Sequence, residues 1–320
     1  MLRRCFAIVV LSCGATVSAV AQQPSEFVSL PTAAKAGSFA ISTSGSVAAA
    51  TCGNSKLLIW SLPAGHLERS LDLPARDVDV FTMSDDGHSI FLGDHHGLAT
   101  VWDSSTGTVR MEIKFPRYFA AAAFSHDDKF LAVAPMHLPV QIYEVDSQRK
   151  VAELPETTGG SEALVFSPDD SMIASADADT AVRIYRASDA KPLATNTDFV
   201  LEPFAVAFTR DSKQLIAAGG DKTVAFLDVS TGKTLRKFPR LPEPIFVLGV
   251  SFDGTLLGTG TLHADDLSAP ASIIVWEMAS GTIKQRWTPP TQAIGGGWTR
   301  DGYFVVATVT SQAIHLYRLR

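Results

Sequence analysis

The feature that most constrains the fold of this chain is an internal repeat of about 42 residues. In each unit a β-rich segment ends on an aromatic or large apolar residue, and these residues are Trp60, Trp102, Tyr143, Tyr185, Leu227, Trp276 and Tyr317. They are 42, 41, 42, 42, 49 and 41 residues apart. Self-similarity at a period of roughly 20 to 50 residues indicates a repeat architecture rather than a series of unrelated domains.

A second marker counts the same units independently. It is a serine or threonine that lies upstream in every unit, at Ser42, Ser84, Ser125, Ser167, Thr209, Ser251 and Thr299. Two residues further on come Ser44, Asp86, Asp127, Asp169, Asp211, Asp253 and Asp301. This Ser/Thr-x-Asp motif predicts the first hairpin turn of each unit, because short polar side chains can hydrogen-bond the turn backbone. Two separate markers therefore give seven units.

Within a unit, short apolar runs alternate with turn residues. Residues 205–239 contain four such runs, and a third turn with Thr-Gly or Ser-Gly recurs at Gly107, Gly232 and Gly281. No helical period is sustained. Four-stranded units of this length that repeat around an axis form a propeller. The sequence therefore predicts an all-β fold, a seven-bladed β-propeller of four-stranded antiparallel blades, as one domain over residues 22–320.

Closure of the ring gives a sharper expectation. The seventh unit ends three residues after Tyr317 and has no fourth strand. The missing strand ends in most units with an apolar residue and proline, and the same pattern occurs at Leu30-Pro31, ahead of the first unit. We expect residues 26–31 to form the outer strand of blade seven beside residues 312–319, so that no blade keeps a bare edge.

The first residues indicate export. Arg3 and Arg4 precede an apolar run over residues 5–20, and Ala19-Val20-Ala21 is a small-residue cleavage site. These are the three parts of a signal peptide, which predicts removal of residues 1–21 and a periplasmic or secreted protein. A lipoprotein signal ending at Cys13 and a twin-arginine signal are alternatives. No later stretch is long and apolar enough for a membrane span.

Charge and cysteine content narrow the function classes. Without Arg3 and Arg4, 25 basic residues stand against 33 acidic ones, and no basic run occurs. This balance argues against binding to nucleic acid or to an anionic membrane surface. Cys52 is the one cysteine left after residue 21, so no disulfide can form within the mature chain, and we expect a buried, inert thiol.

The repeats resemble those of the WD40 family, in residues 166–169 (Phe-Ser-Pro-Asp), 180–185 (Thr-Ala-Val-Arg-Ile-Tyr) and 99–103 (Ala-Thr-Val-Trp-Asp). The resemblance covers about residues 26–320. Trp102-Asp103 is the one Trp-Asp pair, and no unit opens with the Gly-His pair that often begins a WD40 repeat. The family's buried His, Ser and Asp network is therefore not carried over, although Asp179 and Asp221 match its turn aspartate.

In rings that resemble WD40 propellers, the loops between strands two and three share a face with the connections between blades. This placement puts the polar candidates on one face, with Asp94 and Asp177 beside them: His95, His96, His137, Asp179, Asp221, His263, Asp265 and Asp266. The longer loop of blade six, residues 261–272, extends the same face. We interpret it as the binding face of a non-catalytic scaffold for a protein partner, with tolerated polar loops as the alternative.

Enzymatic interpretations find little support in the sequence. No Gly-x-Ser-x-Gly elbow, phosphate-binding loop or zinc-binding Cys/His set occurs, and no spacing of histidines supports a metal site. We therefore expect no cofactor, no metal and a monomer. A lactonase-like or quinoprotein-like propeller, or a protein that binds a small molecule or metal, stays open as the alternative, because such sites are assembled in space rather than in sequence.

Overall fold

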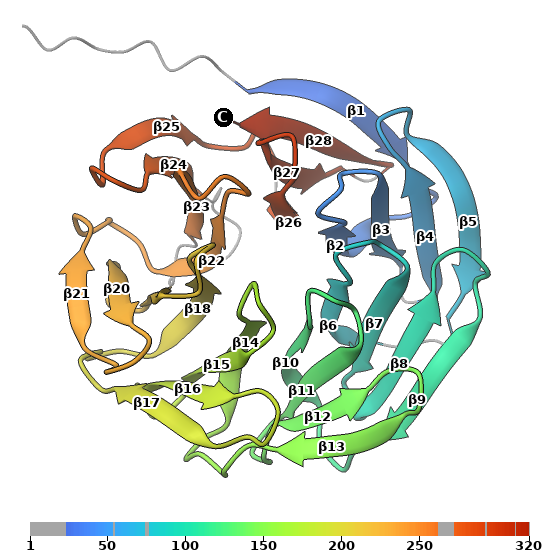
Figure 1. Ribbon diagram of the computed structural model, residues 1–320. Coiled ribbons are helices and arrows are strands. Elements are labelled where there is room, and N and C mark those ends of the chain that lie inside the picture. Colours follow the sequence, from blue (N-terminus) through green and yellow to red (C-terminus); the bar gives the residue numbers. More distant parts are fainter. Residues whose placement is uncertain are drawn as a thin grey trace, which may run out of the picture.

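A computed structural model describes residues 24–53, 55–73, 77–261, 272–291, 293–310 and 312–319. Every regular element among them is a β-strand, and the strands form seven four-stranded antiparallel sheets. Figure 1 shows these sheets arranged as blades around a central axis. The predicted fold class is confirmed. None of the described residues forms a helix that could cross a bilayer.

In the first six blades the strands follow the chain from the axis to the rim. Blades one to three contain β2 (Ala36–Ile41), β3 (Val47–Cys52), β4 (Lys56–Ser61), β5 (His66–Asp72), β6 (Val78–Met83), β7 (Ser89–Asp94), β8 (Leu98–Asp103), β9 (Val109–Lys114), β10 (Phe119–Phe124), β11 (Phe130–Pro135), β12 (Gln141–Glu144) and β13 (Arg149–Glu153). Blades four to six contain β14 (Ser161–Phe166), β15 (Met172–Asp177), β16 (Val182–Arg186), β17 (Pro192–Asn196), β18 (Pro203–Phe208), β19 (Gln214–Gly219), β20 (Val224–Asp228), β21 (Thr234–Lys237), β22 (Ile245–Val250), β23 (Leu256–Thr261), β24 (Ile273–Glu277) and β25 (Ile283–Trp287). Blade seven contains β26 (Ala293–Trp298), β27 (Phe304–Val309), β28 (Ala313–Leu319) and β1 (Ser25–Pro31).

Closure occurs as the sequence predicts. β1 pairs antiparallel with β28, from Ser25 opposite Arg318 to Pro31 opposite Ala313. Leu30 is fully buried in the same core cluster as residues of β27 and β28. Because the amino-terminal strand completes the carboxy-terminal blade, both ends of the described chain lie in one sheet (Figure 1).

The Ser/Thr-x-Asp motif forms the first turns by side-chain hydrogen bonds. In blade two, the Ser84 hydroxyl donates to the Asp86 carboxylate at 2.7 Å and accepts the Ser89 N–H at 2.9 Å, while Asp86 accepts the His88 N–H. The next residue of the turn has a positive φ in all seven blades: Gly45, Gly87, Asp128, Asp170, Ser212, Gly254 and Gly302. Gly, Asp and Ser occupy this position because bulkier side chains disfavour it.

The core lies between neighbouring blades. Three of the residues that mark the repeat are its largest fully buried side chains: Trp60 is 0%, Tyr185 2% and Trp276 1% exposed. Full burial of a large apolar side chain contributes about 1.5–3 kcal/mol. The period visible in the sequence is therefore the period of the core.

Two further features of the sequence, the glycine run of blade seven and Cys52, have defined surroundings in the structure. Gly296 lies in β26, the innermost strand of blade seven, and a Cβ there would come within 2.2 Å of the Val305 carbonyl oxygen. Gly295 is equally confined, since a Cβ there would lie 2.4 Å from the Phe39 carbonyl oxygen, whereas a Cβ on Gly297 would make an ordinary contact with Ile41. Cys52 is a buried free thiol whose Sγ lies 2.9 Å from the Ala34 carbonyl oxygen.

Candidate functional site

The two faces of the ring are built from different loops. The inter-blade face consists of the second turns, among them residues 95–97, 136–140, 178–181 and 220–223, and of the connections between blades, such as residues 115–118 and 197–202. The first-turn face consists of the first turns, such as residues 84–88, 125–129 and 209–213, together with the third turns. Antiparallel pairing places these two sets at opposite ends of every blade.

Two of the predicted residues lie together in the second turn of blade two. The His95 ring stacks on Tyr118 of the next connection, with ring centroids 5.1 Å apart, and its Nδ1 lies 3.2 Å from Asp79. The His96 ring contacts the His95 ring edge-on at 6.3 Å. Tyr118 is 36% exposed, so this group presents an aromatic surface with polar edges.

His137 lies apart from that pair, in the second turn of blade three. It adopts a positive φ of 57° and is exposed. With residues 156–159 of the following connection it lines an open cleft of about 430 Å³. This cleft contains imidazole, carboxylate and hydroxyl groups at one rim.

Asp179 belongs to a charged network inside blade four. Arg183 donates to Asp179 at 2.6 and 2.9 Å and to Asp177 at 2.6 Å. The Asp177 side chain is fully buried and also accepts the hydroxyls of Ser161 and Ser175. Burial raises the pKa of Asp177, although these donors oppose the shift. The network thus joins two carboxylates, two hydroxyls and one guanidinium group within blade four.

Asp221 organises the connection between blades four and five. Its two carboxylate oxygens accept the backbone N–H groups of Val200, at 3.1 Å, and Leu201, at 2.8 Å. The side chains of these two residues point outward, since Val200 is 82% and Leu201 52% exposed. A predicted polar candidate therefore acts here by holding two apolar residues in solvent.

The remaining candidates, His263, Asp265 and Asp266, lie outside the described residues. Within the described part of the chain, no hydrogen bond or ion pair joins candidates from different blades, and no group of three His, Cys, Asp or Glu side chains is placed to hold a metal ion. Each described candidate makes contacts within its own blade or to the adjacent connection.

Sequence reasoning missed a set of residues on the first-turn face. The axial ring, as we name it, comprises the middle residues of the seven Ser/Thr-x-Asp motifs: Thr43, Asp85, His126, Pro168, Arg210, Phe252 and Arg300. They follow the innermost strands and therefore surround the axis. In the sequence, the sign of these residues is that the middle position of the Ser/Thr-x-Asp motif varies while its first and third positions are nearly constant.

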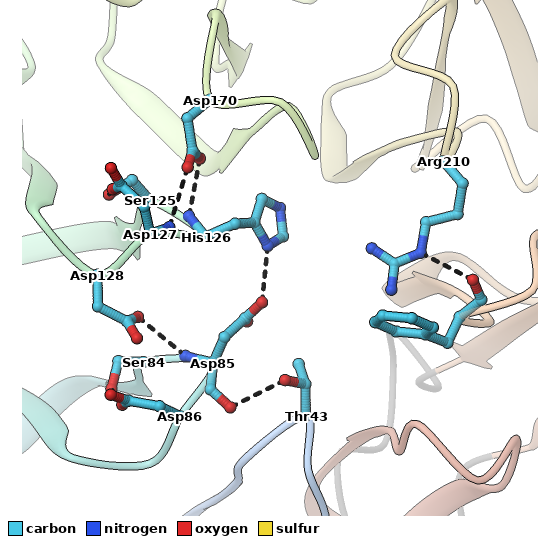
Figure 2. A network of polar contacts seen from close by, with 11 residues as sticks. Thr43, Ser84, Asp85, Asp86, Ser125, His126, Asp127, Asp128, Asp170 and Arg210 are labelled. Carbon is cyan, nitrogen blue, oxygen red and sulfur yellow. Dashed lines mark hydrogen bonds and ion pairs between the residues drawn. The ribbon is translucent and has the colours of Figure 1, made fainter.

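Acidic groups gather on one side of the axial ring, as Figure 2 shows. Asp85 lies 2.8 Å from Nδ1 of His126 in the next blade, and Asp128 accepts the Asp85 N–H at 3.1 Å. Asp170 accepts the backbone N–H groups of His126 and Asp127 at 2.7 and 2.9 Å. The hydrogen bond to Asp85 raises the pKa of His126, whereas burial and the nearby Asp86 raise the pKa of Asp128 to about 6.

Basic groups occupy the other side. The Arg210 guanidinium lies over the Phe252 ring, 3.8 Å from its centroid, and its Nε donates to the Phe252 carbonyl at 3.1 Å. Arg300 lies over the same ring at 5.4 Å. Burial lowers the pKa of Arg210, and Arg300 acts in the same direction. Figure 2 shows Arg210 across the axis from Asp85 and His126.

This arrangement of seven radial blades, closed by an amino-terminal strand, defines a β-propeller. A family model described as WD domain, G-beta repeat matches residues 149–186. That stretch is β13, the outer strand of blade three, followed by β14, β15 and β16 of blade four. The matched repeat within the seven-bladed ring identifies a WD40-type propeller. No curated protein matches the chain.

Proposed function

We propose that this chain is an exported protein-binding scaffold whose partner docks on the inter-blade face. The observation that carries the proposal is the pair Val200 and Leu201, which are 82% and 52% exposed in the connection between blades four and five. Large apolar side chains held in solvent are a feature of protein-protein contact sites. Burying both side chains in an interface would remove most of their remaining contact with water.

The apolar pair is ordered before any partner arrives. Besides the two N–H groups bound by Asp221, the Gly220 N–H donates to the Glu202 carbonyl at 2.9 Å. A Cβ on Gly220 would lie 2.8 Å from the Leu201 Cβ, so the two loops are closely packed. Preordering of a loop reduces the conformational entropy lost on binding, which favours affinity.

Two aromatic stacks from other parts of the inter-blade face add to the proposal. Phe204 and Phe246, the second residues of the inner strands of blades five and six, stack with ring centroids 4.6 Å apart. His95 and Tyr118 form a second stack on blades two and three. Aromatic residues are enriched among those that dominate binding energy at interfaces. We therefore include His95, a residue predicted from the sequence, in the docking surface on account of its aromatic stack with Tyr118.

Export is the second component of the proposal. Cleavage after Ala21 would leave β1, which begins at Ser25, intact for closure of blade seven. The experiment is the mass and amino-terminal sequence of the protein isolated from the cells that produce it. A mature chain beginning at Gln22 supports export, and retention of residues 1–21 in the folded protein contradicts it.

The docking component is tested with a double variant, Val200→Ser with Leu201→Ser. Leu235→Ser provides the matched control, because Leu235 is also 52% exposed but lies on β21 at the rim of blade five. The tagged mature proteins are used to capture partners from the native cell envelope, and the captured partner is then titrated by calorimetry. We expect the double variant to weaken binding at least tenfold, while the control binds as the parent does.

Equal affinity for the double variant and the parent would contradict docking at this surface. The melting temperature of each variant is measured alongside. Both serines replace exposed side chains, so a change of less than about 0.5 kcal/mol in unfolding free energy is expected.

A further inference from the structure

The axial ring carries opposite charges on opposite sides of the axis. Asp85 belongs to blade two and Arg210 to blade five, which are not neighbours in the ring. Each charge nevertheless acts on the other side: Asp85 raises the pKa of Arg210, and Arg210 lowers that of His126. Figure 2 shows the Arg210 side chain opposite Asp85 and His126, so a molecule with one charge at each end can bridge the two sides.

The basic side has two guanidinium groups without an anionic partner. No carboxylate of the described residues forms an ion pair with Arg210 or Arg300. Arg210 uses its Nε for the Phe252 carbonyl, and no hydrogen bond to a described residue occupies its two terminal nitrogens. Phe252, on which both cations lie, is 43% exposed. A guanidinium group with free terminal nitrogens can bind a planar anion through two parallel hydrogen bonds.

A comparison within the molecule shows that this is not the ordinary state of a stacked arginine. Arg236 lies over the Phe226 ring at 4.0 Å, but both of its terminal nitrogens donate to carbonyl oxygens, those of Met278 and Ala279. Arg236 is therefore satisfied within the fold. Arg210 and Arg300 retain donors that a ligand can use.

The acidic side limits which anion fits. The Asp85 side chain is 26% exposed and uses one oxygen, Oδ2, for His126. Asp86, Asp128 and Asp170 add further negative charge on the same side. A dianion such as phosphate is repelled there, whereas a molecule with a carboxylate at one end and an ammonium at the other satisfies both sides.

We propose that the axial ring binds a small zwitterion, with its carboxylate on Arg210 and Arg300 and its ammonium group on Asp85. This site is on the opposite face from the proposed protein-docking surface, and it does not depend on that proposal. It is a binding site, and no bond is made or broken in it.

The test is a calorimetric titration of the mature protein with ω-amino acids from glycine to 6-aminohexanoate. Hexanoate and hexylamine each carry just one of the two charges, and inorganic phosphate is the dianion used for comparison. We expect one chain length to bind at least tenfold more tightly than the carboxylate or the amine alone. Absence of binding at every length, equal binding of hexanoate, or preference for phosphate would each overturn the proposal.

Variants assign the site. Arg210→Gln and Arg300→Gln each weaken the best zwitterion at least tenfold, because each removes charge-assisted hydrogen bonds. Asp85→Asn weakens the zwitterion and does not weaken hexanoate, because it removes the partner of the ammonium group alone. Arg186→Gln, at an arginine of β16 that pairs with Asp189, is the control and has no effect on binding. An equal loss in the control, or unchanged binding in Arg300→Gln, whose side chain makes just a ring contact among the described residues, contradicts the assignment.

Discussion

At the scale of single residues, the turns of this propeller depend on aspartates whose carboxylates accept backbone N–H groups. Asp103 accepts the Ser105 hydroxyl and the N–H groups of Ser105 and Thr106, which lowers its pKa to about 2. Asp128 makes a similar bond to Asp85, yet burial and the nearby Asp86 raise its pKa to about 6. The turns of one propeller thus contain carboxylates with opposite effects on stability as the pH changes.

The raised pKa of Asp128 gives a prediction for Asp128→Asn. Between its ordinary value of 3.8 and about 6, native Asp128 holds a proton that the unfolded chain has lost, so the parent loses stability as pH rises through this window. Asparagine keeps the acceptor for the Asp85 N–H and tolerates the positive φ of 58°. We expect the variant to be more stable than the parent by about 1–3 kcal/mol at pH 8 and equally stable at pH 3.

Urea unfolding at both pH values measures this difference. Asp127→Asn is the control, because the pKa of Asp127 is lowered: burial raises it, but hydrogen bonds from Lys129 and Ser125 lower it more. Removal of the Asp127 carboxylate should therefore lower the free energy of unfolding at pH 8. The account of this turn would be contradicted if the unfolding free energies of the parent and of Asp128→Asn differed by the same amount at both pH values.

The buried pair in blade four gives a second prediction at this scale. Arg183→Met leaves Asp177, whose side chain is fully buried, without its cationic partner. Breaking a buried ion pair costs about 3–5 kcal/mol, and we expect a loss of this order at pH 7. The loss shrinks toward pH 4, because unpaired Asp177 takes up a proton in the native state.

Chemical unfolding of Arg183→Met across this pH range checks the prediction. Arg186→Met, in the same strand, removes an exposed pair with Asp189 and should change stability by less than about 1 kcal/mol. A pH-independent loss in Arg183→Met would show that packing rather than the buried charge is responsible.

At the scale of elements, the sequence predicts strands and turns well because the same local pattern is repeated seven times. Gly107, Gly232 and Gly281 adopt the positive φ expected of the third turns. The outer strand at residues 25–31 was predictable because Leu30-Pro31 matches the ends of other outer strands. The sequence did not predict that Asp221 binds a loop 20 residues upstream, because that contact depends on how two blades pack.

Closure by β1 gives the prediction at this scale. Deletion of residues 22–31 exposes the whole edge of β28 and removes Leu30 from the core. We expect the melting temperature of the ring to fall by more than 10 °C, roughly what a loss of several kcal/mol produces. Calorimetry measures it, with deletion of residues 22–24 as the control that leaves β1 from Ser25 intact. Unchanged melting of the longer deletion would contradict closure.

At the scale of the whole molecule, ring closure brings together residues that no local pattern relates. Asp85 and Arg210 lie in turns far apart in the chain, and they face each other in Figure 2 because every blade repeats the same geometry. Those polar residues predicted for the inter-blade face that the structure describes lie in the loops of that face. However, Asp177 is buried and Asp179 is paired with Arg183. The apolar residues Val200 and Leu201 escaped sequence analysis because burial, not residue type, distinguishes them.

The central claim is that the partner docks on the inter-blade face beside Val200 and Leu201. The most direct measurement is photo-crosslinking in the producing cells, with a photoreactive phenylalanine analogue at position 201 and, separately, at the equally exposed position 235. The account predicts a specific crosslinked protein from position 201 and none from position 235. Crosslinks from position 235 with none from position 201 would contradict it.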